Sequence, residues 1–287
     1  MLRRSVLSYC YLSLVLLFVV PLSVARGEEA ASPGLRVFYT GHSFHMFVVP
    51  RVEGMVKAVP IAGHRLVGQQ GLGGSRVIQH WDLPDDKNKA KAALATGEVD
   101  VFTMAAHLLM PDPGIENFVE LGLKHNPKIR MLVQGSWYPY DVAVKEKVVR
   151  DNNQRDQMQI ADLAPPLAEW KVKLEKQVDD LNQKSGRKVL YIVPAGAAVL
   201  KLREKVIAGD FPGVTKQSEL FTDPIGHARQ HVQTLVAYCN YATIYRRSPV
   251  GLKIIDNSLT DQQQAILQQI AWDTVSSYPY AGVGDKK

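Results

Sequence analysis

Cysteine is nearly absent from this sequence, which has only Cys10 and Cys239. Cys10 lies in an N-terminal apolar segment that we expect to be removed, which would leave a single cysteine and no intrachain disulfide. A scaffold stapled by disulfides is therefore excluded, and the folded chain has to be stabilised by its hydrophobic core. We interpret Cys239, within Ala237-Tyr238-Cys239-Asn240, as a buried small hydrophobic residue.

The N-terminal apolar run is also too short to span a membrane. It extends from about Tyr9 to Leu22, fewer than the roughly 20 residues that a spanning helix needs. It follows Arg3-Arg4 and precedes Ser23-Val24-Ala25, whose small first and third residues suit signal peptidase. We therefore predict a signal peptide over residues 1–25 and export, periplasmic or secreted, rather than an uncleaved anchor. The cleaved chain is expected to have no stable membrane insertion.

The sequence lacks any cluster of lysine and arginine with interleaved aromatic residues. The formal net charge is +6, and loss of Arg3 and Arg4 with the leader would leave +4, with acidic and basic residues interspersed. This pattern excludes nucleic acid as an expected partner. Internal repeats and low-complexity tracts are absent as well. Residues 26–34 are predicted to be a linker, and residues 35–287 a single domain that ends in a helix.

What the chain does have is a regular alternation of short β-branched or aromatic runs with amphipathic helical patterns. This alternation is typical of a parallel sheet with helical crossovers. It predicts an α/β fold, namely a flavodoxin-like three-layer sandwich with a five-stranded parallel sheet. The predicted strands are 36–40, 64–67, 99–104, 129–133 and 189–193, and the predicted helices are 48–58, 87–95, 115–125, 166–184, 225–245 and 261–275.

One segment falls outside this alternation. Residues 138–164 are polar and charged, with Asp151-Asn152-Asn153-Gln154-Arg155-Asp156 at the centre, and they follow the end of a predicted strand. Two interpretations are open, a lid beside a site or a solvated insertion. The polar composition favours the insertion.

Serine, aspartate and histidine occur in positions that suit acyl transfer. Gly41-His42-Ser43-Phe44 follows the first predicted strand, where open α/β sheets place ligand sites. Asp223-Pro224-Ile225-Gly226-His227 opens a predicted helix. Ser43, Asp223 and His227 are therefore a candidate triad for nucleophilic catalysis. The alternatives are that Ser43 or Asp223 caps a helix and that His227 is a packed or capping histidine.

Together with Gly73-Gly74-Ser75 after the second strand, these blocks resemble the GDSL/SGNH hydrolase superfamily in its secreted bacterial branch. The resemblance extends from about Leu35 to Tyr245 and rests on the order and spacing of the blocks, since each block alone is short. It implies a serine hydrolase that needs no cofactor. Ser43 would attack an ester carbonyl, His227 would accept the serine proton and Asp223 would orient the imidazole.

The resemblance also implies that the oxyanion is bound by a glycine of the second block and an asparagine of the third. Gly73 and Gly74 suit the first role, because a backbone without Cβ can approach the substrate closely. A tight strand-to-helix turn is the alternative. The third block here is Met104-Ala105-Ala106-His107, without asparagine. Either the donor is missing, or His107, Gln134 or Ser136 replaces it.

The acid of the candidate triad is a further departure from the family. The last block of the family usually places its acid three residues before the histidine, whereas Pro224 stands at that position here and Asp223 stands four before His227.

A metal site is an alternative role for the histidines. His227 and His231 are four residues apart and would share one face of the predicted helix 225–245. A zinc ion would need a third ligand, for which the sequence offers His42, His45, His80 or His107. The pair is no metalloprotease signature, because Ala228 stands where that motif has glutamate. We therefore predict no metal.

Aromatic residues indicate the kind of substrate. Trp81 and Trp137, with Tyr138, Tyr140 and His80, would offer a stacking surface for a sugar ring if they overlooked one crevice. Ordinary core packing is the alternative. We predict an exported serine esterase for a small acyl ester, in particular an O-acetylated carbohydrate, so the expected partner is a small-molecule or glycan ester. The alternative function, favoured by the missing asparagine, is a catalytically reduced protein that binds a carbohydrate or cell-surface ligand.

Overall fold

The computed structural model describes residues 34–59, 61–142, 148–252 and 258–284. These residues lie in one compact unit, which spans residues 32–287. The predicted signal peptide, residues 1–25, lies outside the described residues, and so does the predicted linker apart from its last residue. In the part of the chain that the structure describes, no helix has the length and apolar character needed to cross a membrane.

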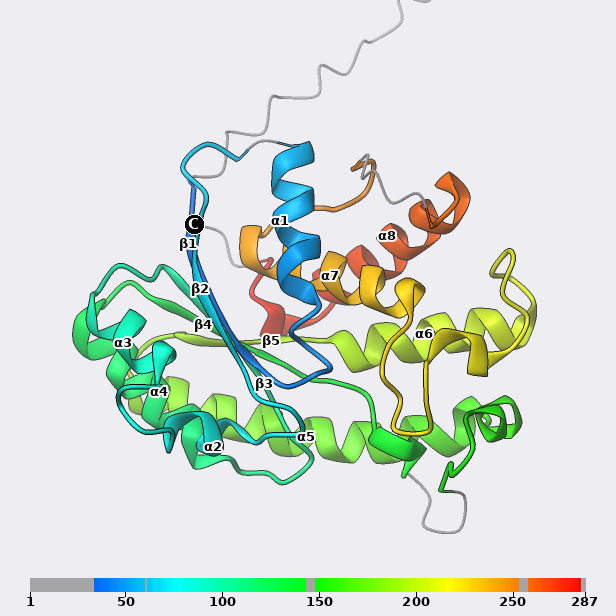
Figure 1. Ribbon diagram of the computed structural model, residues 1–287, viewed down its shortest axis with the longest axis horizontal. Helices are drawn as coiled ribbons and strands as arrows, with labels where there is room; N and C mark the ends of the chain where they lie inside the picture. The colour runs from blue at the N-terminus through cyan, green and yellow to red at the C-terminus, as the bar shows by residue number, and fades with distance from the viewer. Residues whose placement is uncertain (1–33, 60, 143–147, 253–257, 285–287) are drawn as a thin grey trace, which may run out of the picture. The chain divides into compact units, whose positions relative to one another are not determined.

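Five parallel strands form the central sheet, in the spatial order β2-β1-β3-β4-β5 (Figure 1). This order is that of flavodoxin-like sandwiches, so the predicted fold class is confirmed. The strands are β1 (Arg36–Gly41), β2 (Arg65–Gly71), β3 (Val101–Ala105), β4 (Arg130–Gln134) and β5 (Leu190–Val193).

The edge strand β2 differs from the other four. All residues of β3 and β5 are buried, as are those of β1 after Arg36 and of β4 after Arg130, because helices cover both faces of the sheet. In contrast, β2 is mostly exposed or half-buried, and it runs to Gly71 rather than to the predicted end at Val67. Its second half is Gly68-Gln69-Gln70-Gly71, which carries no apolar signal and is held by backbone pairing with β1.

Helices form the two outer layers (Figure 1). Each layer encloses its own hydrophobic core, with Tyr39 and Leu132 in the first and Phe102 and Val133 in the second. The first layer consists of α1 (Val48–Ala58), α6 (Ala195–Ala208), α7 (Gln230–Tyr245) and α8 (Asp261–Ser276). The second consists of α2 (Val77–Trp81), α3 (Lys89–Ala95), α4 (Pro113–His125) and α5 (Ile160–Lys184).

Four of these helices depart clearly from prediction, namely α2, α5, α6 and α7. Helices α2 and α6 were not expected, α2 because it is a single short turn and α6 because its first residues, Ala195-Gly196-Ala197-Ala198, are small and show no clear apolar stripe. Helix α5 starts at Ile160 rather than 166, because Pro165 and Pro166 lie inside the helix instead of at its start. Short 3-10 turns complete the fold: η1 (Pro139–Asp141), η3 (Asn152–Gln157), η4 (Gln217–Leu220) and η5 (Pro279–Ala281).

Helix α7 begins at Gln230, later than the predicted start at residue 225. The residues before it form a loop that is closed by an isolated bridge between Phe221 and Ala228. The loop cannot be helical because Gly226 has a φ of 99°. Helix α7 itself is buried on nearly all sides, and Cys239 within it is 0% exposed, as its apolar surroundings in the sequence suggested.

Candidate active site

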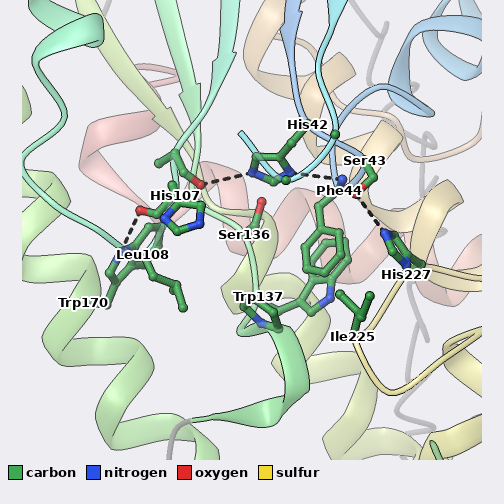
Figure 2. Close-up of a pocket in the computed structure, with 14 residues that line it drawn as sticks. His42, Ser43, Phe44, His107, Leu108, Ser136, Trp137, Trp170, Ile225 and His227 are labelled. Carbon is green, nitrogen blue, oxygen red and sulfur yellow. Dashed lines mark hydrogen bonds between the residues drawn. The ribbon is translucent and has the colours of Figure 1, made fainter. Parts of the chain in front are cut away.

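A pocket of about 350 Å³ lies outside the carboxyl ends of the strands (Figure 2). The loops that follow β1, β2, β3 and β4 line it, together with Trp170, Ile225 and His227. The chain reverses its direction along the sheet between β1 and β3, which is where open parallel sheets bind ligands. The volume is within the range of small-molecule sites.

Ser43, His227 and Asp223 form a hydrogen-bonded row beside this pocket. Ser43 Oγ lies 2.9 Å from His227 Nε2 (Figure 2), and His227 Nδ1 lies 2.6 Å from Asp223 Oδ2. Ser43 is exposed, and the other two side chains are each 35% exposed. A carboxylate has no hydrogen to donate, so His227 Nδ1 carries the ring hydrogen and Nε2 accepts from the Ser43 hydroxyl. This arrangement is the one in which an imidazole can take a serine proton.

The loop before α7 places Asp223 and His227 in this geometry. Asp223 Oδ1 accepts hydrogen bonds from the backbone N–H of Gly226 at 2.9 Å and of His227 at 3.2 Å. Partial burial raises the pKa of the Asp223 carboxyl, but hydrogen bonds from the His227 ring and from the two N–H groups outweigh it and lower the pKa below its ordinary value. Because the loop turns at Gly226, an acid four residues before the histidine reaches its ring.

His42 fastens the turn that carries Ser43, a role that the sequence did not indicate. Its Nδ1 accepts the backbone N–H of Phe44 at 3.2 Å, and its Nε2 faces the carbonyl oxygen of Ala106 at 3.4 Å (Figure 2). Burial lowers the pKa of His42 to about 4, so the ring is neutral at pH 7. A neutral ring accepts at one nitrogen and donates at the other, and it ties the loop after β1 to the loop after β3.

Gln134 is fully buried below that turn, and this corrects its expected place as an oxyanion donor. Its Nε2 donates to the Phe44 carbonyl oxygen at 2.8 Å and to Ser136 Oγ at 2.9 Å. Its Oε1 lies 2.9 Å from His45 Nδ1 and accepts from Asn240 Nδ2 at 3.0 Å. Both amide hydrogens are therefore used inside the protein, and the side chain does not line the pocket.

Gly73 and Gly74 line the pocket, and no other atom crowds them on that side. Gly74 has a φ of 61°, a conformation that favours glycine, and a Cβ added at either position would meet nothing within 4 Å. The turn that holds them is fixed by Ser75, whose hydroxyl donates to the Leu72 carbonyl at 2.8 Å. Within the described residues, the backbone N–H groups of Ser43 and Gly74 donate no hydrogen bond. Both remain free for a ligand oxygen.

His107 and Ser136 lie on the pocket wall where the third sequence block was expected to contribute. Burial, and next the positive charge of Arg76, lower the pKa of His107. Its Nδ1 accepts the backbone N–H of Leu109 at 3.2 Å, so in the neutral ring Nε2 carries the hydrogen and can donate. Ser136 Oγ accepts from Gln134, which leaves the hydroxyl hydrogen of Ser136 available as well.

Aromatic rings form much of the pocket wall. Phe44 and Trp137 are stacked, with ring centroids 4.7 Å apart and planes 9° apart, and Trp137 Nε1 donates to the Gly226 carbonyl at 2.9 Å. Trp170, Leu108 and Ile225 also line the pocket and were not foreseen. Trp170 comes from the middle of α5, where a tryptophan normally indicates core packing, so the sequence carried no signal for its position.

Trp81 does not reach the pocket, contrary to the expected stacking surface. Its ring packs edge-on against Phe118 with centroids 5.2 Å apart, and Lys91 Nζ lies 4.5 Å from its centre. Tyr138 also turns away, because its hydroxyl donates to the Pro166 carbonyl at 3.0 Å. Trp81 ends α2 and Tyr138 follows β4, but both side chains pack against the hydrophobic core of the second helical layer.

The histidines do not gather into a metal site. His227 lies in the loop and His231 in the first turn of α7, so they do not share a helix face, and His231 packs edge-on against Phe211. His45 is bonded through Nε2 to Thr103 Oγ1 at 2.9 Å, and His80 through Nε2 to Ser75 Oγ at 2.8 Å. Across the described ranges, no group of three or more His, Cys, Asp or Glu residues could hold a metal ion.

The fold of this chain is similar to that of a solved structure. A DUF4886 family protein from Bacteroides uniformis aligns with a TM-score of 0.56 at 13% identity, over 86% of this chain and 96% of its own. A suggested SGNH hydrolase from Slackia heliotrinireducens gives a TM-score of 0.45 at 16% identity, over 74% and 99%. A suggested GDSL-like lipase from Parabacteroides merdae gives 0.47 at 10% identity, over 77% and 98%.

At these identities the first match shows a shared fold alone, and the other two superpose too loosely to support an argument. No family model matches the sequence, and no curated protein matches it either.

Proposed function

We propose that this chain is an exported serine esterase of the SGNH type that hydrolyses a small acyl ester. The observation that carries the proposal is the row from Ser43 through His227 to Asp223, with contacts of 2.9 Å and 2.6 Å, beside an open pocket. The order of the sequence blocks supports the same function. Export rests on residues 1–25, and sequencing the N-terminus of the protein recovered outside the cytoplasm tests it.

In the proposed reaction, Ser43 Oγ bonds to the ester carbonyl carbon while its proton passes to His227 Nε2. The carbonyl π electrons move to the oxygen and form a tetrahedral oxyanion. Collapse of this intermediate breaks the bond to the alcohol oxygen, which takes the proton from His227 and leaves an acyl group on Ser43. Water then attacks the acyl carbon in the same way, and the acid leaves with regeneration of Ser43. Asp223 stays ionised and stabilises the imidazolium.

The oxyanion would be bound by the backbone N–H groups of Ser43 and Gly74, neither of which is used within the described part of the chain. A third donor is needed where the SGNH family has asparagine. His107 Nε2 is our first candidate, because its ring lines the pocket and its other nitrogen is already an acceptor. The hydroxyl of Ser136 is the second. Preorganised donors of this kind are worth about 10²–10³ each in turnover.

The pocket walls support a short acyl group, in particular one carried by a sugar. Phe44, Trp137, Leu108 and Ile225 offer apolar surface, while His107 lies among them with a polar edge. An apolar face with polar groups beside it suits an acetyl group or the face of a sugar ring. We expect acetyl and butyryl esters to be hydrolysed faster than long-chain esters.

A second candidate function is favoured by the third block. Ala106 and His107 stand where the family supplies an asparagine, so the site can be a catalytically reduced one that binds a carbohydrate or cell-surface ligand. The same pocket would then act as a binding site. Failure of Ser43 to react in a correctly folded protein would favour this function.

The test is reaction of the purified chain from Arg26 onward with a fluorophosphonate probe, which reacts with activated serines. We expect labelling of the wild type, with the adduct mapped to Ser43, and none in the Ser43→Ala or His227→Ala variants. Ser185→Ala is a matched control, because this serine only donates to the Leu181 carbonyl at the end of α5. Labelling that survives in Ser43→Ala, or absence of labelling in the folded wild type, contradicts the proposal.

A further inference from the structure

The segment between β4 and α5 holds the loop of Asp223 and His227 by its backbone. Four successive carbonyl oxygens of that loop, those of residues 223–226, accept hydrogen bonds from this segment. Arg155 Nη2 donates to the carbonyl of Asp223 at 3.3 Å and of Pro224 at 2.6 Å. The backbone N–H of Tyr140 donates to Ile225 at 3.0 Å, and Trp137 Nε1 donates to Gly226 at 2.9 Å. A plain solvated insertion makes no such contacts, so that interpretation does not hold for Tyr140 and Arg155.

Arg155 is 0% exposed, and its buried positive charge is stabilised by the buried carboxylate of Asp141. Its Nη1 lies 2.8 Å from Asp141 Oδ1. Arg203 pairs with the same carboxylate, through Nη1 and Nη2 at 2.9 Å each. Two guanidinium groups therefore share one carboxylate, which leaves an excess of positive charge in a buried place. The carbonyl oxygens of Asp223 and Pro224 are the negative ends of dipoles that face this excess charge.

The orientation of the Arg155 guanidinium is fixed from its other sides. Its Nε donates to Asn152 Oδ1 at 3.1 Å, and Asn152 Nδ2 in turn donates to the Phe221 carbonyl at 3.1 Å. The guanidinium lies over the ring of Phe221, 4.5 Å from its centroid. Gln217 Nε2 donates to the Arg155 carbonyl at 2.8 Å. Arg155 thus has a single position from which it can bind the loop.

Two residues of this segment, Tyr140 and Asp141, are held in an unfavourable backbone conformation. Tyr140 has a φ of 57° and Asp141 a φ of 47°, in the left-handed region that side chains other than glycine disfavour. Such residues persist where their surroundings fix them, and they concentrate at functional sites. Here Tyr140 supplies an N–H to the loop, and Asp141 supplies the carboxylate for Arg155.

We infer that Arg155 is a positioning residue for the candidate triad. By binding the carbonyls of Asp223 and Pro224, it holds the loop so that the Asp223 carboxylate, the His227 ring and Ser43 Oγ stay in contact. The inference rests on the proposed function for its catalytic consequence. Its physical part, restraint of the loop, does not.

The first experiment compares Arg155→Met with Arg203→Met, each of which removes one of the two partners of Asp141. Arg203 donates to Asp141 and Gln217 but not to the loop, so it is the matched control. With p-nitrophenyl acetate, we expect kcat to fall at least tenfold in Arg155→Met, because small displacements of reacting groups are costly. KM should stay within about threefold, since Arg155 does not line the pocket. Arg203→Met should lose less than threefold in kcat at a similar loss of thermal stability.

Two further variants keep the test decisive if Arg155→Met does not fold. Arg155→Lys retains the buried charge and should restore part of kcat. Trp137→Phe keeps the ring stacked on Phe44 but removes the donor to the Gly226 carbonyl, and it should lower kcat by a smaller factor. Equal losses of kcat in the Arg155 and Arg203 variants, in proportion to their stability, would overturn the inference.

Hydrogen exchange separates this inference from the proposed function. The N–H groups of Gly226 and His227 are bonded to Asp223 Oδ1, so they are protected while the loop is held. We expect faster exchange over residues 222–229 in Arg155→Met than in Arg203→Met. Unlabelled wild-type protein that shows this exchange difference would refute the esterase and retain the restraint. Unchanged exchange in Arg155→Met would refute the restraint whether or not the wild type is an esterase.

Discussion

The two sides of the site are held in place by different chemistry. The Ser43 turn is fastened by neutral groups, since His42 binds Phe44 N–H and Gln134 binds the Phe44 carbonyl. The loop of Asp223 and His227 is fastened by the charged group of Arg155, which is paired with Asp141. Both sets of side chains are buried.

The difference teaches which disturbances each side tolerates. The neutral network depends on histidines that stay uncharged, so low pH should destabilise it. The charged network depends on one carboxylate that is shared by two guanidinium groups, and loss of Asp141 would leave two buried positive charges without a partner. The serine and its base meet through a single contact of 2.9 Å between Ser43 and His227, so a shift on either side is felt there.

The largest effect is expected from Asp223→Asn, which reverses the direction of the hydrogen bond between residue 223 and His227 Nδ1. An asparagine oxygen can still accept from Gly226 and His227 N–H, but its NH2 group then faces His227 Nδ1. That nitrogen would become an acceptor, and Nε2 would carry the hydrogen and could not accept the serine proton. We expect the labelling rate to fall about 10³–10⁴-fold with little change in thermal stability. An Asn variant that labels at the wild-type rate would remove Asp223 from the triad.

The neutral side is broken most directly by Gln134→Leu. This change removes the hydrogen bonds that Gln134 makes with His45 Nδ1, with Asn240 Nδ2 and with the Phe44 carbonyl, which should cost about 2–4 kcal/mol of the free energy of unfolding. We expect roughly a tenfold loss of labelling rate as the Ser43 turn loosens. Gln177→Leu is the matched control: this buried glutamine bonds the backbone of Asp112 and neither residue lines the pocket, so the variant should lose stability without a comparable loss of labelling. Equal losses of labelling would contradict the role assigned to Gln134.

Acid should weaken the neutral side first. Burial lowers the pKa of His42, His45 and His80 to about 4, below the ordinary histidine value of 6.5. Between pH 6.5 and 4 the unfolded chain therefore binds more protons than the folded one, and the free energy of unfolding falls as pH decreases. The expected size is on the order of 1–3 kcal/mol per histidine by pH 4. Urea unfolding at several pH values measures this loss of free energy. The His45→Gln variant should show a weaker dependence of the free energy of unfolding on pH.

The smallest effect concerns the turn that contains Gly73 and Gly74. Gly74→Ala places a side chain at a φ of 61° and should cost about 1–2 kcal/mol, whereas Gly73→Ala meets no atom and has an ordinary φ. Thermal unfolding of the pair gives the difference. Identical midpoints would show that the turn at Gly74 has relaxed to another conformation.

The sequence predicted the fold well because burial leaves a strong pattern. The runs around Val37, Val101 and Leu132 are apolar on both faces, and the five strands and their parallel arrangement followed from them. The end of β2 was missed because Gly68 to Gly71 carry no apolar side chain, although they pair with β1 through the backbone. The start of α7 was missed because the φ of Gly226 and the bonds of the Asp223 carboxylate are not visible in a helical pattern.

For the site, the sequence proposed Ser43, Asp223 and His227, and the structure brings their side chains into contact; their catalytic roles stay a proposal. Gln134 was misplaced because a strand end does not tell on which side a side chain lies. The importance of Arg155 was missed for a different reason. A polar run predicts a solvated surface, and only the three-dimensional pairing with Asp141 shows that the arginine is buried.

Cys239, buried in the middle of α7, has a practical consequence. Burial raises the pKa of its thiol to about 12, and alkylating reagents attack the thiolate. In a chain that begins at Arg26 it is the sole thiol, so its modification requires α7 to leave the core. The rate of Cys239 alkylation therefore reports the unfolding of the protein around α7, without an added probe.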